Sequence, residues 1–313
     1  MNLKKLILNF LTITIGLILF ILWHQNNINS TKANSLLRYK KIYLVTMDKE
    51  FEFWNYVNQG ASDLARAIGV PYFWVAPETR DFNEQIKIID DIVDDGANAI
   101  LVAVDDPRKL ASVIEDAKAR GVKIVYVDAP SYEEAITTLM TDNYEAGRAV
   151  AGELLRALEE QNIGSGEIGI VSLQSRINDN TREKGIKDVI EEDGRFILND
   201  TVYTNAEVEE TRVVVDGMIQ GNANLVGLIG TNEGVTEGLG KAIRDNNNKV
   251  IGVGFDKTNT ILQLLEEGSL KAVIVQNPYT MGYLGVAEAV AGLEGMNTGP
   301  SIIDTGFTVL RKE

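Results

Sequence analysis

The chain has 313 residues, of which 45 are Asp or Glu and 30 are Lys or Arg, so its formal charge is −15. This acidic balance argues against nucleic-acid binding, because a nucleic-acid backbone requires a surface rich in Lys and Arg. With no cysteine and a single histidine, His24, the chain can form no disulfide, zinc–thiolate site, histidine-based triad or lipoprotein anchor. The length is sufficient for two α/β lobes, each with its own core.

The N-terminus contains an apolar run from residue 6 to residue 23, preceded by Lys4 and Lys5. A helix of this length spans about 27 Å, close to the hydrocarbon thickness of a bilayer. The lysines are expected to stay in the cytoplasm, which places the rest of the chain outside it. We predict an uncleaved, single-pass signal anchor over residues 1–23. The alternative is a cleaved secretory signal, whose best cleavage site, residues 31–33, lies well beyond the apolar run.

Residues 24–40 are rich in Asn, Ser and Lys without periodicity and are predicted to form a tether. From residue 41 onward, strand and helix patterns alternate. The strands of the first half are predicted at 41–47, 71–76, 100–104 and 123–128, with helices at 53–68, 83–95 and 107–120. In the second half the strands are predicted at 167–173, 196–203, 225–230, 250–256, 269–276 and 307–310, with helices at 181–192, 207–219, 233–244, 261–267 and 281–293. Such alternation is typical of parallel sheets with right-handed crossovers.

Two of these strands end in an aspartate at matching places in the two halves. The strand before Asp128 and the strand before Asp256 are both apolar and rich in β-branched residues. The carboxyl ends of parallel strands face the crevice in which ligands bind. Two lobes facing each other would place the two carboxylates on opposite walls of one cleft, where they can accept hydrogen bonds from the hydroxyl groups of a sugar. The alternative is that each aspartate caps the helix that follows it.

Other candidate binding residues follow strand ends. Phe53 and Trp54 come after the first strand, where aromatic side chains either close the end of the sheet or stack on a ligand. Arg182 is predicted in the first turn of a helix, a position that opposes the helix dipole and therefore indicates an anionic or hydroxyl-rich partner, or a neighbouring glutamate. Asn232 and Gln276 each end a strand and offer an amide donor and acceptor.

Together these residues resemble the periplasmic sugar-binding proteins of the ribose-, galactose- and xylose-binding type, from about residue 41 to the C-terminus. The resemblance rests on seven short motifs: Gly60-Ala61, Asp128, Thr141-Asp142-Asn143, Arg182-x-x-Gly185, Thr231-Asn232-Glu233, Gly254-Phe255-Asp256 and Gln276-Asn277-Pro278. It implies the type I fold of this family, with two Rossmann-like α/β lobes of parallel sheets joined by a three-segment hinge. The first lobe would comprise residues 41–141 and 277–304, and the second residues 142–276 and 305–313.

The resemblance also implies roles for the candidate residues. Phe53 and Trp54 would sandwich a sugar from the first lobe, and Asp128 would bind its hydroxyl groups. Arg182, Asn232, Asp256 and Gln276 would contact it from the second lobe and the hinge. The first lobe departs from the ribose pattern at Met47, Phe51, Val104 and Ala129, where Asp48 or Asp105 would compensate. Trp54 resembles xylose-binding relatives, which favours D-xylose.

Three functions compete. The anchor and the missing cysteine favour a tethered receptor that reports sugar to a LytS-type sensor histidine kinase in the membrane. The second is the substrate-binding component of an ABC importer, whose partner is a permease. The third and most distant is a glycosidase that uses Asp128 and Asp256, which would need a carboxylate separation of roughly 5 to 10 Å. We expect a binding protein rather than an enzyme, without metal or cofactor.

Overall fold

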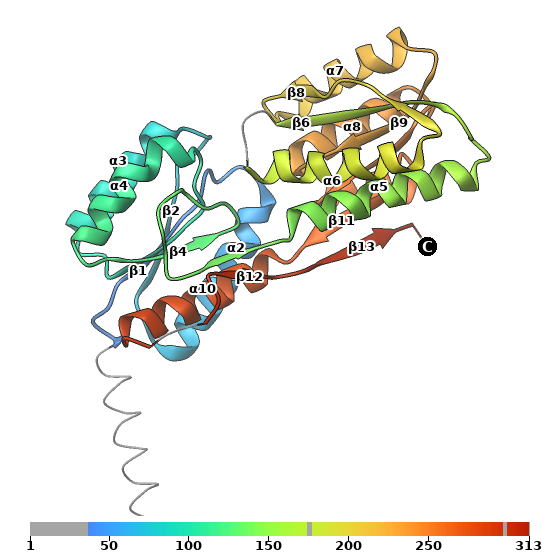
Figure 1. Cartoon of the computed structure of the whole chain (residues 1–313). Helices are drawn as coiled ribbons and strands as arrows, with labels where there is room; N and C mark the ends of the chain where they lie inside the picture. The colour runs from blue at the N-terminus through green and yellow to red at the C-terminus, as the bar shows by residue number, and fades with distance from the viewer. Residues whose placement is uncertain (1–36, 174–176, 297–298, 313) are drawn as a thin grey trace, which may run out of the picture.

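The computed structural model describes residues 37–173, 177–296 and 299–312, which form two α/β lobes (Figure 1). The first lobe contains a sheet in the order β12-β5-β4-β3-β1-β2, with every pairing parallel. Its strands are β1 (Ile42–Val45), β2 (Tyr72–Val75), β3 (Ala99–Val102), β4 (Lys123–Val127), β5 (Thr138–Met140) and β12 (Ile302–Asp304).

Helices cover both faces of this sheet because alternate strand residues point to opposite sides. Leu44, Leu101 and Val125 pack against α2 (Glu52–Ile68) and α10 (Pro278–Leu293). Tyr43 and Ile100, on the other face, pack against α3 (Phe82–Asp94) and α4 (Pro107–Ala119). The strands are therefore apolar on both faces, as the continuous hydrophobic runs of the sequence predict.

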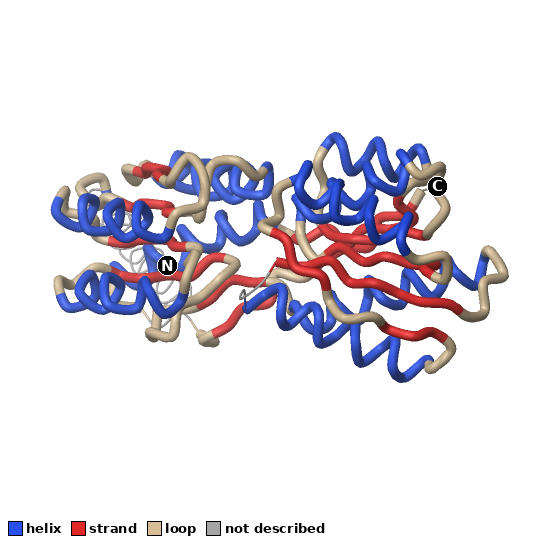
Figure 2. Tube along the Cα trace, turned by 90° about the horizontal axis from the view of Figure 1, so that it is seen from above, coloured by secondary structure: helices blue, strands red, loops and turns tan. Residues whose placement is uncertain are grey.

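The second lobe has the same layered arrangement (Figure 2). Its sheet has the order β13-β11-β10-β9-β6-β7, and β8 also pairs with β6. The strands are β6 (Gly166–Leu173), β7 (Phe196–Leu198), β8 (Val202–Thr204), β9 (Leu225–Gly230), β10 (Ile251–Phe255), β11 (Leu270–Gln276) and β13 (Phe307–Arg311). Helices α5 (Asn143–Glu160) and α6 (Ile177–Asp193) cover one face, and α7 (Val208–Gly221), α8 (Glu233–Asp245) and α9 (Asn259–Glu267) cover the other.

The chain passes between the two sheets after Met140, after Gln276 and after Asp304. The connecting segments are hydrogen-bonded to one another. The N–H of Asp142 donates to Oδ1 of Asp304 at 3.0 Å, and the N–H of Thr305 donates to the carbonyl of Met140 at 2.9 Å. The side-chain amide of Asn277 donates to the carbonyl of Thr305 at 2.7 Å, so all three segments are linked.

In each lobe, glycines let the backbones of two helices meet closely where the helices cross. A Cβ on Gly60 of α2 would lie 2.0 Å from the carbonyl oxygen of Tyr279, and a Cβ on Gly282 of α10 would lie 1.9 Å from that of Val57. In the second lobe, a Cβ on Gly147 of α5 would lie 2.1 Å from the carbonyl oxygen of Arg182, on α6. No side chain larger than hydrogen fits at these distances without moving a helix.

The structure adds three elements to the predicted set: β5, α5 and β12. The two strands have three residues each, too few for a periodic pattern, and the buried face of α5 includes the small residues Ala146, Gly147 and Ala151. The strand predicted at 196–203 is two separate strands, β7 and β8. The predicted parallel sheets are present, with β13 as one antiparallel edge strand in the second lobe.

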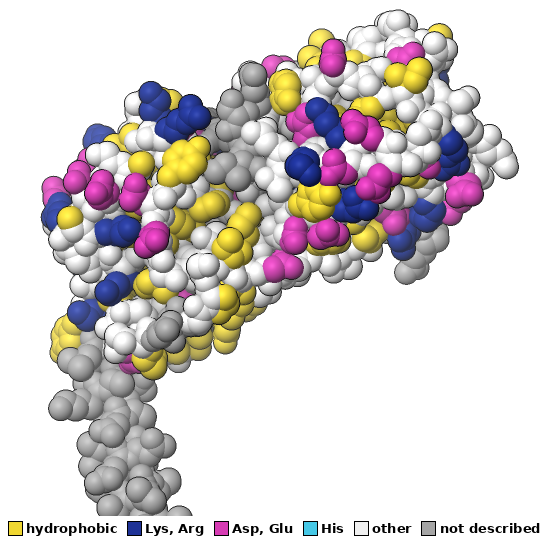
Figure 3. All heavy atoms as spheres, viewed as in Figure 1, with side chains coloured by type: hydrophobic (Ala, Val, Ile, Leu, Met, Phe, Trp, Pro, Cys, Tyr) yellow, Lys and Arg dark blue, Asp and Glu magenta, His cyan; other side chains and the backbone are white. Residues whose placement is uncertain are grey.

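No helix in the described part of the chain is both long and apolar enough to cross a bilayer. The predicted anchor over residues 1–23 and most of the tether lie outside the described residues. On the face seen in Figure 3, acidic and basic side chains of the second lobe are interspersed, without one extended basic patch.

A glycine pair on α5 tests the importance of the close helix crossing. We expect Gly147→Ala to lower the free energy of unfolding by about 1–3 kcal/mol, because a methyl group cannot fit against the Arg182 carbonyl. Gly152, on the same helix, is exposed and has open space around it, so Gly152→Ala should raise stability by about 0.5–1 kcal/mol. Urea unfolding followed by circular dichroism measures both. Equal stability of the Gly147→Ala protein and the wild type would contradict the close contact.

Candidate functional site

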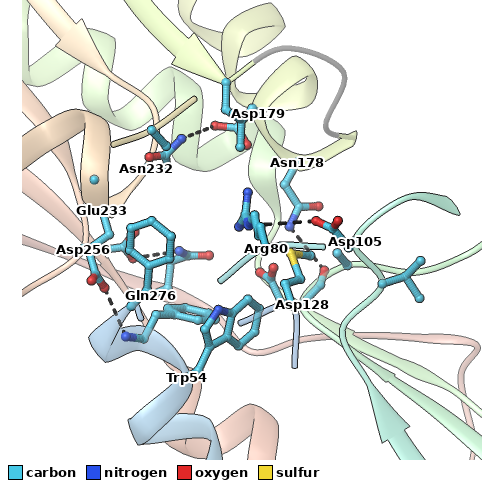
Figure 4. Close-up of a pocket in the computed structure, with 18 of the residues that line it drawn as sticks. Trp54, Arg80, Asp105, Asp128, Asn178, Asp179, Asn232, Glu233, Asp256 and Gln276 are labelled. Atoms are coloured by element: carbon cyan, nitrogen blue, oxygen red, sulfur yellow. Dashed lines mark hydrogen bonds and ion pairs between the residues drawn. The ribbon is translucent and has the colours of Figure 1, made fainter. Parts of the chain in front are cut away.

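A pocket lies between the lobes, at the carboxyl ends of both sheets (Figure 4). Its first-lobe wall comes from the segments that follow β1, β2, β3 and β4, and its second-lobe wall from those around α6 and at the ends of β8, β9, β10 and β11. Of the nine predicted site residues, eight line this pocket: Phe53, Trp54, Asp105, Asp128, Arg182, Asn232, Asp256 and Gln276.

The two strand-end aspartates share an unusual backbone conformation. Asp128 has φ 63° and Asp256 has φ 71°, both in the left-handed region that side-chain-bearing residues rarely adopt. Neither caps the following helix, since Thr258 caps α9 and β5 precedes the next helix after Asp128. The tight turn instead directs each carboxylate into the pocket from its own sheet. Strained residues of this kind cluster at functional sites.

Both carboxylates are buried, and burial changes their acidity. Burial raises the pKa of Asp128 to about 6. The Arg182 guanidinium lowers this pKa, and the nearby carboxylates of Asp256 and Asp179 raise it further. Burial also raises the pKa of Asp256, and the nearby Arg182 opposes this shift as well. A buried carboxylate without a full set of partners gains from accepting hydrogen bonds, so both side chains favour a ligand that donates hydroxyl groups.

Arg182 is buried and uses three of its N–H groups within the protein. Nε donates to Asn143 Oδ1 at 2.8 Å, one terminal nitrogen donates to the Thr231 carbonyl at 2.7 Å, and the other donates to Gln276 Oε1 at 2.7 Å. The amide nitrogen of Gln276 then donates to Asp256 Oδ1 at 2.8 Å. Helix α6 begins at Ile177, so the prediction that Arg182 lies in the first helical turn is wrong.

Asn232 lines the pocket and also caps a helix of the second lobe. Its side-chain oxygen accepts the N–H of Val235 and caps α8, and its amide nitrogen donates to Asp179 Oδ1 at 3.0 Å. Asp179 also accepts the hydroxyl of Thr231 at 2.6 Å. The amide of Asn232 therefore orients a further carboxylate in the second-lobe wall.

The aromatic residues of the first lobe do not sandwich a ligand as predicted. The rings of Phe53 and Trp54 contact each other edge to face, with centroids 4.9 Å apart and planes at 86°, so no sugar fits between them. Both line the pocket on one side. The indole N–H of Trp54 is buried and has no acceptor among the described protein atoms, which makes it a candidate donor to a ligand.

Arg80 is a pocket residue that the sequence analysis did not identify. Its Nε lies 3.3 Å from Asp48 Oδ2 and 3.9 Å from Asp105 Oδ1, and its guanidinium lies 5.7 Å from the centre of the Phe51 ring. Asp48 is fully buried behind Arg80 and also accepts the N–H groups of Glu50 and Phe51, so it supports the wall and does not line the pocket. The sequence signal for Arg80 was a cation shortly after the end of β2.

Three second-lobe residues were also missed: Asn178, Asp179 and Glu233, all in the pocket wall. Asn178 donates its side-chain N–H to the Asp128 carbonyl oxygen at 3.4 Å and thereby connects the two lobes across the pocket. Asn178 and Asp179 lie in the first turn of α6, which begins at Ile177, four residues earlier than predicted. The error in the helix boundary concealed them.

Comparison with known proteins identifies relatives of most of the described region. The periplasmic binding protein domain matches residues 42–297. The xylose/arabinose-binding protein XylF of Sulfolobus acidocaldarius is 24% identical over 240 residues, which are 72% of this chain and 59% of that protein. The D-apiose import binding protein of Paraburkholderia graminis is 23% identical over 270 residues, which are 85% of this chain and 82% of that protein.

Solved structures share the fold. An ABC transporter solute-binding protein from Burkholderia graminis, in complex with D-arabinose, has a TM-score of 0.82 and 27% identity, covering 88% of this chain and 96% of that one. The domain match covers well over half of the chain, and it includes strands of both sheets. The chain therefore belongs to the periplasmic binding protein family, a family of extracytoplasmic solute-binding proteins that are not enzymes.

Proposed function

We propose that this protein captures a monosaccharide between its lobes, with a pentose as the first candidate and D-xylose favoured. The observation that carries the proposal is the placement of Asp128 and Asp256 on opposite walls of one pocket, each buried and each in a strained strand-end turn. Hydroxyl groups are the donors that two such acceptors require. Relatives whose names specify xylose, arabinose or apiose support the choice of sugar class.

Different residues of the pocket would make different kinds of contact with the sugar. Asp128 and Asp256 accept sugar hydroxyl groups, while Arg80 and the indole N–H of Trp54 donate to sugar oxygens. The faces of Phe53 and Trp54 supply the apolar surface for the C–H groups of the ring. Arg182 acts through its hold on Gln276, which keeps Asp256 in place.

We propose that the protein delivers its sugar to an ABC importer. Relatives named as import-binding proteins or as transporter components favour this role over the sensor-kinase role. The kinase role stays a prediction that rests on the apolar run at residues 6–23 and on the absence of cysteine. In either role, closure of the lobes on sugar changes the surface that a membrane partner meets.

Calorimetry of the purified protein against pentoses and hexoses tests the ligand class. We expect one sugar to bind per chain, with D-xylose or another aldopentose binding most tightly.

Substitutions in the pocket test the roles of its residues. Trp54→Ala should cost about 1–3 kcal/mol of binding free energy through lost apolar contact, and Arg80→Gln about 1.5–3 kcal/mol through lost charged hydrogen bonds. Asp91→Asn, on the exposed face of α3, is the control and should bind like the wild type. Binding of no sugar by the wild type would refute the proposal.

The pH dependence of affinity tests the role of Asp128. Because burial raises the pKa of Asp128 to about 6, the folded protein keeps this proton at pH values where the carboxyl of an unfolded chain is ionised. The ionised form is the stronger acceptor, so affinity should fall as the pH is lowered from about 7.5 to about 5. Asp128→Asn should bind more weakly with a flatter pH profile. Identical profiles for the two proteins would show that ionisation of Asp128 does not contribute.

Fractionation of cells that express the full chain tests the anchor and the partner. We expect the protein to stay in the membrane fraction with its original N-terminus, because residues 6–23 are long enough to span a bilayer. Affinity purification in the presence of sugar should recover importer permease subunits. Recovery of a sensor kinase without a permease would favour the signalling role, and a mature N-terminus near residue 34 in a secreted pool would rule out the anchor.

A further inference from the structure

The N-terminus of α2 has no cap from its own segment. Its N-cap residue is Phe51, which carries no side-chain acceptor, although the first N–H groups of a helix need partners outside the helix. The N–H of Glu52 donates to Glu233 Oε1 at 2.9 Å, and the N–H of Phe53 donates to Glu233 Oε2 at 3.0 Å. We call this pair of contacts the inter-lobe cap, because α2 belongs to the first lobe and Glu233 to the second.

Glu233 lies between the N-termini of two helices. It is the first residue of α8, whose own cap is the side chain of Asn232, so the carboxylate of Glu233 is free to serve α2. Each helix N-terminus carries a partial positive charge of roughly half a unit. Two such ends repel each other when the lobes approach, and a side chain between them that accepts hydrogen bonds from one end offsets that repulsion.

The inter-lobe cap is largely enclosed by protein: Glu233 and Phe53 are buried, and Glu52 is half-buried. The Phe51 ring packs against the cores of both lobes. A Cβ on Gly234 would lie 3.0 Å from Phe51 Cε1 and 2.0 Å from the Ala206 carbonyl oxygen, so glycine allows this approach. Burial raises the pKa of Glu233 to about 8, and the nearby Asp256 also raises it. The N–H groups of Glu52 and Phe53 lower this pKa because they stabilise the carboxylate. Figure 4 shows Glu233 beside Asp256 on the second-lobe wall.

The helix turn that receives Glu233 also carries the aromatic residues of the site. Phe53 and Trp54 lie in the first turn of α2, so a carboxylate that fixes this turn also fixes both rings relative to the second lobe. We propose that Glu233 is a positioning residue that stabilises the closed cleft by capping α2 from the opposite lobe, without using the sugar as its partner. The effect on sugar affinity rests on the function proposed above.

The inter-lobe cap has a specific energetic consequence. Opening the lobes breaks both hydrogen bonds at once and returns the carboxylate and the two N–H groups to water. The cap therefore changes the fraction of protein that is closed, and the apparent affinity for every ligand of the closed form changes by the same factor. A residue that touches the sugar would instead change the affinities of different sugars by different factors.

Two substitutions separate the inter-lobe cap from a local effect on α8. Glu233→Gln keeps one acceptor oxygen but turns an amide N–H toward the second backbone N–H of α2. Glu233→Asp keeps an acid in the first turn of α8 but is one methylene too short to reach α2. The control is Glu209→Gln, which removes a first-turn acid from α7 in the same lobe, where Glu209 pairs with Arg212. The lobe separation of the ligand-free protein is measured by fluorescence energy transfer between labels in the two lobes, and affinities by calorimetry with several sugars.

We expect both Glu233 variants to shift ligand-free protein toward wider lobe separations and to weaken every sugar by one common factor, roughly 5- to 30-fold. Glu209→Gln should change neither quantity. Wild-type behaviour of Glu233→Asp would show that the acid serves α8 alone and would overturn the proposal. A loss of affinity confined to one sugar would overturn it as well. If the wild type binds no sugar, the proposed function fails, and the lobe separation of the ligand-free variants still decides the role of Glu233.

Discussion

The buried guanidinium of Arg182 is the group on which the arrangement of the cleft depends. It holds Asn143 at the start of α5 and Gln276 at the end of β11, and both of these residues lie beside points where the chain passes between the lobes. Its charge also opposes the cost of burying Asp128 and Asp256, one from each lobe. Loss of a buried cation leaves such carboxylates uncompensated, which is far more costly than loss of an exposed ion pair. The walls of the pocket and the joint between the lobes are therefore stabilised by the same side chain.

The layered fold and the two strand-end carboxylates were predictable because each depends on local sequence. The runs before Asp128 and Asp256 are apolar and β-branched, a pattern that specifies a buried strand, and the end of a parallel strand has a known place relative to the ligand crevice. Helix α5 was not predictable in the same way. Its buried face uses alanine and glycine to approach α6, and small residues give a weak periodic signal.

The missed site residues depend on contacts between distant segments. Arg80 belongs to the pocket because Asp48 and Asp105, which follow other strands, hold its guanidinium there, and no spacing in the sequence indicates that meeting. Glu233 was visible only as part of a helix start, where an acid is ordinary. Its partner is a backbone segment 180 residues away that lacks a cap of its own. An unremarkable residue can thus acquire its role entirely from the opposite lobe.

The left-handed turns at Asp128 and Asp256 also restrict how this protein can change over generations. Asparagine and glycine tolerate such a backbone at little cost, aspartate nearly as well, and β-branched or bulky residues poorly. A new residue at either position must therefore fit the left-handed backbone before its contact with the ligand matters. A β-branched or bulky side chain at either position would strain the turn, whatever contact it offered to a ligand. A change of ligand is therefore easier to reach through neighbours that lack this constraint, such as Arg80 and Trp54.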